Sequence, residues 1–511
     1  LIWGTGCGKE DTNITILQPN LPDDFLSEVT ILPNPYNLSP LTALLEFSTK
    51  EAVSIQLRVI GLHGSASDVN RVFPDLRQNF SLPVVGLYPN HLNQIELSLF
   101  NESGEAIIQQ ILTIQAEEQL PQLPIININK IDESRLTSGW NLVNYFGHTG
   151  QIFPQRPFMF DEFGDIRWYL DFQSDPRLAN LFFDNGLNQL QNGNFIFGDV
   201  NTGVLYEITL LGEIVERMDL NRSGLGFHHS VVEKSDGQLI VTVDDLTKNT
   251  VEDVIVEIDW QGRKSITNKW DLNESLDNTR TVWESDISNI AEDWFHANST
   301  AYDTRDNTII VSGRTQGVVK LTAANEVVWI LAPHKGWRTN GRGEDLNQFL
   351  LQPLDSDGQP IEDMEVLGGE KNHPEFEWAW YQHTPVLLPN GNLSLFDNGE
   401  NRNYKPDEKY SRAVEYAIDE TNKTIQQVWT YGKERGLAAY SRIVSKTTYH
   451  ESTDNVLFTP GAILFSGLNY GKVIEINRLS DEIIFEATII APMTNFNVTF
   501  HNVQRIRPFL E

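Results

Sequence analysis

The chain has 511 residues, one cysteine and a formal net charge of −32. This charge argues against nucleic-acid binding, because phosphate recognition draws on a surplus of Lys and Arg. A single cysteine excludes an intramolecular disulfide and a cysteine metal cluster. At this length we expect two domains, or one repetitive fold with an attachment, and the 40% of hydrophobic residues supply a large core.

The N-terminal segment lacks a starting Met and is similar to the end of a bacterial signal peptide. Cys7 follows small residues and precedes polar ones, as in lipoprotein cleavage sites, although Gly4 stands where an aliphatic residue is usual. We therefore expect residues 1–20 to be a signal-peptide remnant that tethers the protein to a membrane through a lipidated Cys7. The expected location is periplasmic or outer-surface. A disordered N-terminus is the alternative.

Apolar and polar residues alternate over residues 54–60, 94–100 and 107–114. A period of two predicts β-strands, and this part of the chain shows no helical periodicity. We therefore predict a small antiparallel β-sandwich over residues 21–122. Two prolines between residues 117 and 124 indicate a linker, after which the second domain takes residues 123–511.

From about residue 125 a turn-forming pair flanked by β-rich runs recurs, which is typical of a repeat fold. The turns are centred on Gly193, Gly237, Asp306, Gly391 and Asp454. A second turn follows several of them, so that two hairpins form a four-stranded unit. Five such units and one around residues 158–168 predict six blades, closed by a last strand near residue 505. The expected fold class is all-β: a six-bladed β-propeller preceded by a small N-terminal β-sandwich. The irregular period leaves seven blades as the alternative.

Histidines recur at one position of this repeat. His229 and His383 each lie eight residues before the turn glycine, and Asn185 holds the same place in another unit. His296 lies ten residues before Asp306, one small insertion away. Because the first strands of the blades line the central channel, these side chains should converge on one axis. Such convergence indicates a functional site more strongly than any one histidine does.

Other polar residues accompany these histidines. Asn298 is two residues from His296 and so faces the same side of a strand. Arg314 ends the neighbouring strand, and its guanidinium fork matches the oxygens of sulfate or phosphate. Adjacent strand residues point oppositely, so only one of His228 and His229 faces the channel; we favour His229. These residues predict a local anion site in an otherwise acidic protein.

Six longer motifs surround these positions. They are Phe227-His-His-Ser, Asp293-Trp-Phe-His-Ala-Asn-Ser, Ser312-Gly-Arg-Thr-Gln-Gly, Phe376-Glu-Trp-Ala-Trp-Tyr-Gln-His-Thr-Pro, Phe396-Asp-Asn-Gly and Trp429-Thr-Tyr-Gly-Lys-Glu-Arg-Gly. They resemble motifs of the bacterial aryl-sulfate sulfotransferases, the nucleotide-independent arylsulfotransferase family. The stretch that begins Asn34-Pro-Tyr-Asn resembles the N-terminal β-sandwich of that family, so the resemblance covers nearly the whole chain.

The resemblance implies that a sulfuryl group moves from a phenolic sulfate ester to a phenol acceptor by a ping-pong mechanism. The intermediate is a sulfohistidine, and neither a cofactor nor a metal ion is implied. His383 matches the nucleophile of the family. With His383 we assign Arg314 and His296 to catalysis, His296 as the proton shuttle. His229, His228 and Asn298 are assigned to substrate binding. The resemblance also implies a homodimer.

Two features depart from the family pattern. Well-known members carry a disulfide shortly before the nucleophile, but residues 364–371 contain no cysteine. A late threonine of the family falls near residues 441–448, where the best register places Val444. Ser445 or Thr447 could take over its contact, and the sequence does not decide between them.

Other functions make different demands on the sequence. A quinone-cofactor dehydrogenase needs tryptophan-rich docking repeats and a calcium site, which the sequence does not show. A copper reductase needs a cysteine-bound electron-entry site, which one cysteine cannot build. A non-catalytic propeller that binds a partner or a glycan is the main alternative to the sulfotransferase.

Overall fold

The computed structural model describes residues 14–17, 21–22, 24–148, 155–181, 185–280, 292–492 and 497–507. Strands dominate, and the α-helices among these residues are the single turns α1 (Leu272–Ser275) and α2 (Met364–Leu367). No described helix has the length and apolar character needed to cross a membrane. Cys7, the residue of the expected lipid tether, lies outside the described residues.

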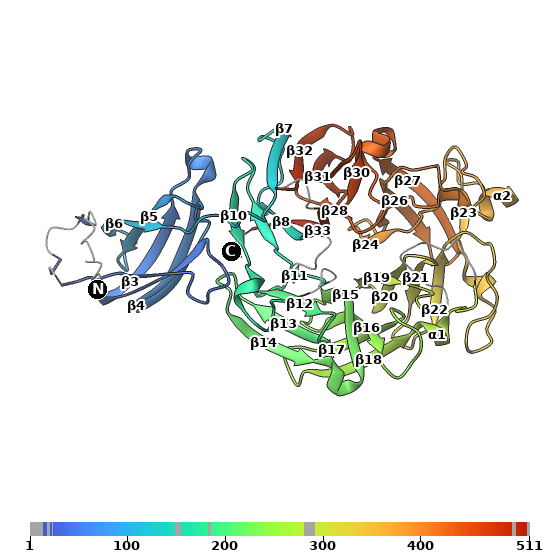
Figure 1. The fold of residues 1–511 in the computed structure, drawn as a ribbon, viewed down its shortest axis with the longest axis horizontal. Coiled ribbons are helices and arrows are strands. Elements are labelled where there is room, and N and C mark those ends of the chain that lie inside the picture. Colours follow the sequence, from blue (N-terminus) through green and yellow to red (C-terminus); the bar gives the residue numbers. More distant parts are fainter. Residues whose placement is uncertain are drawn as a thin grey trace.

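The N-terminal part is an antiparallel assembly of six strands, on the left in Figure 1. Its strands are β1 (Ile14–Ile16), β2 (Thr30–Pro33), β3 (Thr42–Val59), β4 (Val69–Val85), β5 (Leu92–Phe100) and β6 (Ala106–Gln115). The long strand β3 pairs with β2 along its first half, with β5 along its second half and with β4 along both. The predicted alternating runs fall on β3, β5 and β6, so the prediction of strands here is confirmed.

The rest of the described chain forms six further sheets, which we number in chain order. Sheet 1 contains β8 (Trp140–His148), β9 (Phe158–Phe160), β10 (Ile166–Tyr169) and β33 (Asn497–Ile506). Sheet 2 contains β11 (Asn188–Gln189), β12 (Phe195–Asp199), β13 (Val204–Ile208) and β14 (Ile214–Asp219). Sheet 3 contains β15 (Leu225–Glu233), β16 (Leu239–Asp245), β17 (Val254–Asp259) and β18 (Ser265–Asp271).

The remaining three sheets follow the same plan. Sheet 4 contains β19 (Ala297–Asp303), β20 (Thr308–Gly313), β21 (Gly317–Leu321) and β22 (Val327–Leu331). Sheet 5 contains β24 (His383–Leu387), β25 (Leu393–Asp397), β26 (Arg412–Asp419), β27 (Thr424–Tyr431) and the parallel edge strand β23 (Gln352–Leu354). Sheet 6 contains β28 (Lys446–His450), β29 (Asn455–Thr459), β30 (Ile463–Phe465), β31 (Leu468–Asn477), β32 (Ile483–Ile490) and β7 (Ile125–Ile131).

These sheets are arranged in a ring, as blades of a propeller, with β33, β11, β15, β19, β24 and β28 toward its centre (Figure 1). Neighbouring inner strands pack on one another from β15 round to β33. Two strands close the ring: the C-terminal β33 pairs with β8 of sheet 1, and β7 pairs with β32 of sheet 6. The last strand therefore joins the first sheet, as the sequence predicts.

The five predicted turns connect the first two strands of sheets 2 to 6. Gly193, Gly237 and Gly391 have φ angles of 87°, 81° and 88°, and Asn307 and Asp454 take φ angles of 58° and 52° in the other two turns. Such left-handed backbone is favourable for glycine and tolerated by Asn and Asp. The turn residues of the sequence are thus the ones that this geometry requires.

In sheets 2, 5 and 6 a buried glutamate on the third strand ties the turn to its sheet and to a neighbour. The carboxylates of Glu207, Glu415 and Glu475 accept hydrogen bonds from asparagines of the adjacent inner hairpins. Each also accepts from the following sheet or the closing strand, through Trp260, Arg478 and Arg505. Sheet 4 reverses the charges, because Lys320 stands at this position and binds Asp303, Asp306 and Glu420. These ties fix the register of the sheets on which the site depends.

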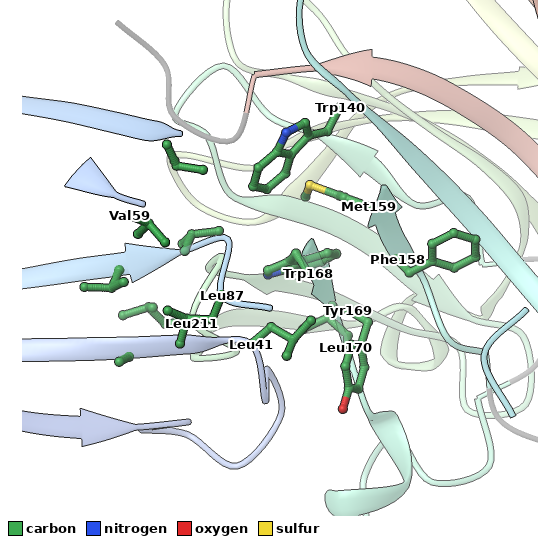
Figure 2. Packing of buried hydrophobic residues seen from close by; sticks show 14 of the residues in the cluster. Leu41, Val59, Leu87, Trp140, Phe158, Met159, Trp168, Tyr169, Leu170 and Leu211 are labelled. Atoms are coloured by element: carbon green, nitrogen blue, oxygen red, sulfur yellow. The ribbon is translucent and has the colours of Figure 1, made fainter. Parts of the chain in front are cut away.

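One hydrophobic cluster joins the N-terminal part to sheets 1 and 2. Leu41 and Leu87 pack there with Trp140, Trp168 and Leu211 (Figure 2). Arg167 crosses the same boundary: its guanidinium donates to the Gly86 carbonyl and to the Asp161 carboxylate, and it stacks 3.8 Å from the ring centre of Tyr88. The N-terminal part is therefore fixed against the outside of the ring, away from its centre.

Candidate active site

His383 and Lys446 occupy equivalent positions on the neighbouring inner strands β24 and β28. His383 pairs with Phe396, and Lys446 pairs with Thr459. On the second strand of sheet 5, Phe396 lies two residues after Ser394, which pairs with Glu415 of the third strand. On the second strand of sheet 6, Thr459 likewise lies two residues after Leu457, which pairs with Glu475. By the same comparison, His229, Asn298, His501 and Asn185 stand at or next to this level on the other inner strands. A ring of polar side chains therefore surrounds the axis at one height.

Five members of this ring line one cavity of about 280 Å³: His229, Asn298, His383, Lys446 and His501. Asn185 instead accepts a hydrogen bond from the side chain of Asn144. The inner strands continue past the ring and add apolar walls of Leu187, Val231, Val386 and Leu387. No carboxylate is among the described residues that line the cavity. The lining therefore combines imidazoles, an amide and an ammonium with apolar side chains and with further polar groups such as Tyr302 and Gln504.

The backbone is irregular where the ring residues sit. His229, His296, Thr384 and Val444 have φ angles between 49° and 56°, and the strand register shifts next to the first three. Positive φ is uncommon for residues with a β-carbon, above all for β-branched ones such as Thr384 and Val444, and such strain concentrates at functional sites. A bulge also re-aims the side chains that follow it. These irregularities explain why simple alternation along the sequence does not place every ring residue.

His383 is buried and its imidazole is held from one side. Its Nδ1 lies 2.8 Å from Oδ1 of Asn398 and 3.2 Å from the backbone oxygen of Tyr381. Both neighbours are acceptors, so Nδ1 carries the proton and Nε2 keeps its lone pair. Burial, with the Arg314 guanidinium as the next cause, holds the pKa of His383 well below its usual range. At neutral pH His383 is therefore an uncharged imidazole with a defined tautomer.

Asn398 fixes this tautomer because its own orientation is determined. Its Nδ2 donates to the backbone oxygens of Ser441 and Val444, at 2.8 and 3.0 Å. With the amide nitrogen engaged there, the amide oxygen must face His383. Asn398 is fully buried at the end of β25, next to Asp397, which binds the buried guanidiniums of Arg402 and Arg412. The nucleophile candidate thus has a rigid supporting residue.

His296 has a different electrostatic environment. Its Nδ1 lies 2.6 Å from Asp293 Oδ2 and 2.8 Å from Glu252 Oε2. Burial lowers the pKa of His296, but the two carboxylates outweigh burial and raise the pKa to about 10. The ring centre of His296 lies 5.0 Å from that of His229, which lines the cavity. At neutral pH His296 is therefore a fixed cation next to the polar side chains that surround the axis.

The two histidines of the 228–229 pair separate as the sequence predicts. His229 lines the cavity, and its ring centre lies 6.0 Å from that of His501. His228 is buried behind it, with its Nδ1 3.2 Å from Nδ1 of His229. His228 does not line the cavity, so its place is that of a support for His229.

Arg314 lies near His383 but does not line this cavity; together with Tyr381 and Gln382 it lines a second pocket. Its side chain is 1% exposed, Nη2 lies 3.3 Å from Oε2 of Glu400, and the guanidinium carbon lies 5.0 Å from the ring centre of Tyr381. Its backbone N–H donates to the His296 carbonyl at 3.0 Å. Arg314 thus joins the His383 and His296 positions and places a guanidinium beside the nucleophile.

Asn298 ties sheets 4 and 5 together at the level of the ring. Its Nδ2 donates to the Gln382 carbonyl at 2.8 Å, and its Oδ1 accepts from the Ser299 hydroxyl. The same hydroxyl accepts from the backbone N–H of Thr384 at 2.8 Å. Asn298 and Ser299 therefore hold both residues that flank His383 in the chain.

Three groups of described side chains bring possible metal-ligand atoms within 4.8 Å of one another. They are His228, His229 and Glu252; Glu252, Asp293 and His296; and Asp303, Asp306 and Glu420. In the second and third groups the carboxylates already surround a cationic side chain of the protein, His296 or Lys320. The first group offers a single carboxylate. Charge balance in these groups does not call for an ion.

Comparison with protein families matches both parts of the chain. A family model described as Arylsulfotransferase (ASST) matches residues 125–497, and one described as Arylsulfotransferase Ig-like domain matches residues 30–117. The chain belongs to the arylsulfotransferase family.

The relatives agree with this family. The chain is 28% identical over 566 residues to the arylsulfate sulfotransferase AssT of Lelliottia amnigena, which covers 94% of this chain and 92% of that protein. The identity is also 28%, over 573 residues, to AssT of Escherichia coli O6:H1, with the same coverage. Among solved structures, a streptogramin B lyase covers 85% of this chain and 98% of its own at 12% identity, with a TM-score of 0.31 that carries no argument about function. The protein is therefore a sulfotransferase enzyme of the arylsulfotransferase family.

In this arylsulfotransferase, hydrogen bonds and ion pairs hold the segment before His383, which contains no cysteine. Residues 364–367 form α2, whose Val366 carbonyl accepts from the indole of Trp378 at 2.8 Å. Arg412 donates to the Glu377 carbonyl and to Asp397. This network takes the place of a covalent link between the segment and sheet 5.

At the position of the family threonine, no hydroxyl faces the cavity. Val444 is buried with a φ of 54°, and the Ser445 hydroxyl donates to Ser441 Oγ and accepts from the Gly461 N–H. Thr447 is 1% exposed and does not line the cavity. Lys446, between them, does line it.

The sequence analysis did not find several residues of the site. Asn398, Glu252 and Asp293 support histidines from positions that only the folded chain brings near. His501 does not share the repeat position of the other histidines in the sequence, but it lines the cavity. A signal for Lys446 does exist: it lies eight residues before Asp454, the turn residue with positive φ, as His383 lies eight before Gly391.

Proposed function

We propose that this arylsulfotransferase works in two half-reactions, through a sulfuryl group bound covalently to Nε2 of His383. The observation that carries the proposal is the fixed tautomer of His383, with its Nδ1–H donated to Asn398. A neutral imidazole with its lone pair on Nε2 is a competent nucleophile near pH 7.

In the first half-reaction Nε2 of His383 attacks the sulfur of the donor ester. The bond between sulfur and the phenolic oxygen breaks, and the electron pair leaves with that oxygen. Arg314, Asn298 and His229 are the groups we assign to the sulfuryl oxygens, whose charge preorganised donors stabilise. Asn398 accepts the Nδ1–H throughout, and this contact strengthens as the imidazole gains positive charge.

In the second half-reaction the oxygen of the acceptor phenol attacks the same sulfur, and the electron pair of the nitrogen–sulfur bond returns to Nε2. The cavity supports this order of events. Its volume of about 280 Å³ lies near the lower end of the ~300–1,000 Å³ typical of small-molecule sites. It has room for one substituted ring, so donor and acceptor take turns in it.

His296 fits a different role from the proton shuttle that the sequence analysis assigns to it. A shuttle must release its proton near the working pH, whereas Asp293 and Glu252 raise the pKa of His296 to about 10. We assign to His296 the role of a permanent cation that orients His229.

A chromogenic assay tests the proposal. The protein is incubated with 4-nitrophenyl sulfate, with and without an added phenol, and nitrophenol release is followed. Sustained release only when phenol is present identifies a transferase. Equal release in water alone identifies a sulfatase, and no release with either favours a non-catalytic propeller; either result contradicts the proposal.

A further inference from the structure

Lys446 is the one lysine among the described residues that line the cavity. It holds on β28 the position that His383 holds on the adjacent inner strand β24, and these strands pack on each other. Lys446 is therefore a neighbour of the nucleophile at the same height in the ring. Nothing in the family resemblance assigns a role to this lysine.

Two cations with buried side chains are neutralised by carboxylates. Lys320 contacts three carboxylates, and Arg505 binds Glu475 at 2.6 Å. By contrast, the side chain of Lys446 is half-buried, and its ammonium has no hydrogen bond or ion pair within the described part of the chain. Placing an ammonium in a cavity without a counterion costs free energy, which indicates that a ligand supplies its partner.

The groups around Lys446 do not compensate its charge. The other titratable side chains that line the cavity are His229, His383, His501 and the phenol Tyr302. Tyr449 and His450 lie on the same strand as Lys446. Burial lowers the pKa of Lys446 to about 8, so the side chain is mostly protonated at pH 7 but gives up its proton readily. A general acid or base works best in this range.

We propose that Lys446 is the catalytic acid and base that exchanges a proton with the phenolic oxygen of donor and acceptor. This inference rests on the proposed two-step function. When the sulfur–oxygen bond of the donor breaks, the ammonium gives one proton to the leaving oxygen, so that phenol and a neutral amine result. In the second half-reaction the amine takes the proton of the acceptor hydroxyl while its oxygen attacks the sulfur. One turnover returns Lys446 to the ammonium form.

The leaving group provides the first test. 4-Nitrophenolate leaves readily without a proton, whereas unsubstituted phenolate is more basic and needs one. Lys446→Met should therefore reduce the donor half-reaction with phenyl sulfate by roughly 10²- to 10⁴-fold, the usual contribution of acid–base catalysis, and with 4-nitrophenyl sulfate by about tenfold or less. An equal loss with both esters would overturn the inference, because it would mean that the lysine only attracts the anion.

Lys446→Arg separates charge from proton transfer, since arginine keeps the charge and does not release a proton. The inference predicts that this variant forms the sulfated enzyme from 4-nitrophenyl sulfate but passes the group to phenol at least 10²-fold more slowly. An arginine variant with normal transfer to phenol would overturn it. This variant also serves as the test if Lys446→Met fails to fold.

The pH dependence of the wild type provides a second readout. The donor half-reaction with phenyl sulfate needs the ammonium, so its rate should fall as the pH rises through about 8. Attack by the acceptor phenol on the sulfated enzyme needs the amine, so its rate should rise over the same range. Both limbs should vanish in Lys446→Met; if they persist, another group transfers the proton.

Lys472→Met is the matched control. Lys472 lies on β31 of the same sheet and pairs with Glu486 outside the cavity. It should keep the leaving-group dependence and both pH limbs of the wild type. A wild-type enzyme that transfers no sulfuryl group would contradict the proposed function itself, whereas an active wild type with an indifferent Lys446→Met contradicts only the role of the lysine.

Discussion

Arg314 permits a substitution that separates geometry from charge. Arg314→Lys keeps a cation beside His383 and keeps the backbone N–H that donates to the His296 carbonyl. It removes the planar fork, which can bind two sulfuryl oxygens at once, and the stacking on Tyr381. The change therefore tests whether recognition of the sulfuryl group depends on the shape of the guanidinium.

The expected loss follows from these contacts. Removing a preorganised donor from a developing anionic charge costs about 2.7–4 kcal/mol, a factor of roughly 10²–10³ in turnover. The stacking contact is worth about 0.5–2 kcal/mol, so the fold should survive. Because the charge stays, the pKa of His383 should remain low, and the acid limb of the pH profile should not move.

Steady-state turnover of 4-nitrophenyl sulfate with phenol measures the first effect, and thermal unfolding measures the second. Arg478→Lys is the control, because Arg478 also forms a two-pronged ion pair, with Glu415, but far from the cavity. It should lose stability and keep turnover per folded molecule. An Arg314→Lys variant with near wild-type turnover would refute the assignment of Arg314 to the sulfuryl group.

Two further predictions concern the surroundings of the nucleophile. With Cys7 as its single cysteine, the enzyme should keep its specific activity in strong thiol reductants, because hydrogen bonds of Arg412 and Trp378 hold the segment before His383; inactivation by reductant alone would mean that this segment is held differently or that Cys7 acts between molecules. Asn398→Leu should slow the donor half-reaction at least about fivefold, since the tautomer of His383 loses a hydrogen bond worth roughly 1 kcal/mol or more. Single-turnover nitrophenol release checks this, and a wild-type burst rate in a folded Asn398→Leu would show that Asn398 does not position the imidazole.

Local sequence signals predict much of the fold. Turn residues such as Gly193, Gly237 and Gly391 stand where the backbone needs a positive φ, and the apolar runs beside them become the inner hairpins. The closing strand β33 could also be predicted, because residues near 505 have strand character. The pairing of β7 with β32 could not be predicted from local signals, since it joins segments more than 350 residues apart.

The site is predictable only where its residues follow the repeat. His229 and His383 are found by counting back from a glycine, but a bulge at Phe500–Val503 hides the equivalence of His501. Lys446 follows the same count from Asp454, which looks like an ordinary turn residue until its φ is known. Supporting contacts such as Asn398 with His383 depend on packing between strand ends, and no local pattern reports them.

The most direct test of the account is to locate the sulfuryl group on the enzyme. Incubation with 4-nitrophenyl sulfate and no acceptor should release about one nitrophenol per enzyme and then stall, as expected for covalent catalysis. Peptide mapping should find an acid-labile sulfuryl group on the peptide that contains Gln382-His383-Thr384. His383→Asn should abolish both burst and label, His296→Asn should slow the burst but keep the label, and His334→Asn, a histidine outside the ring, should change neither. A label on His229 or His296 would reassign the nucleophile, and sequential kinetics with no label would contradict the covalent mechanism.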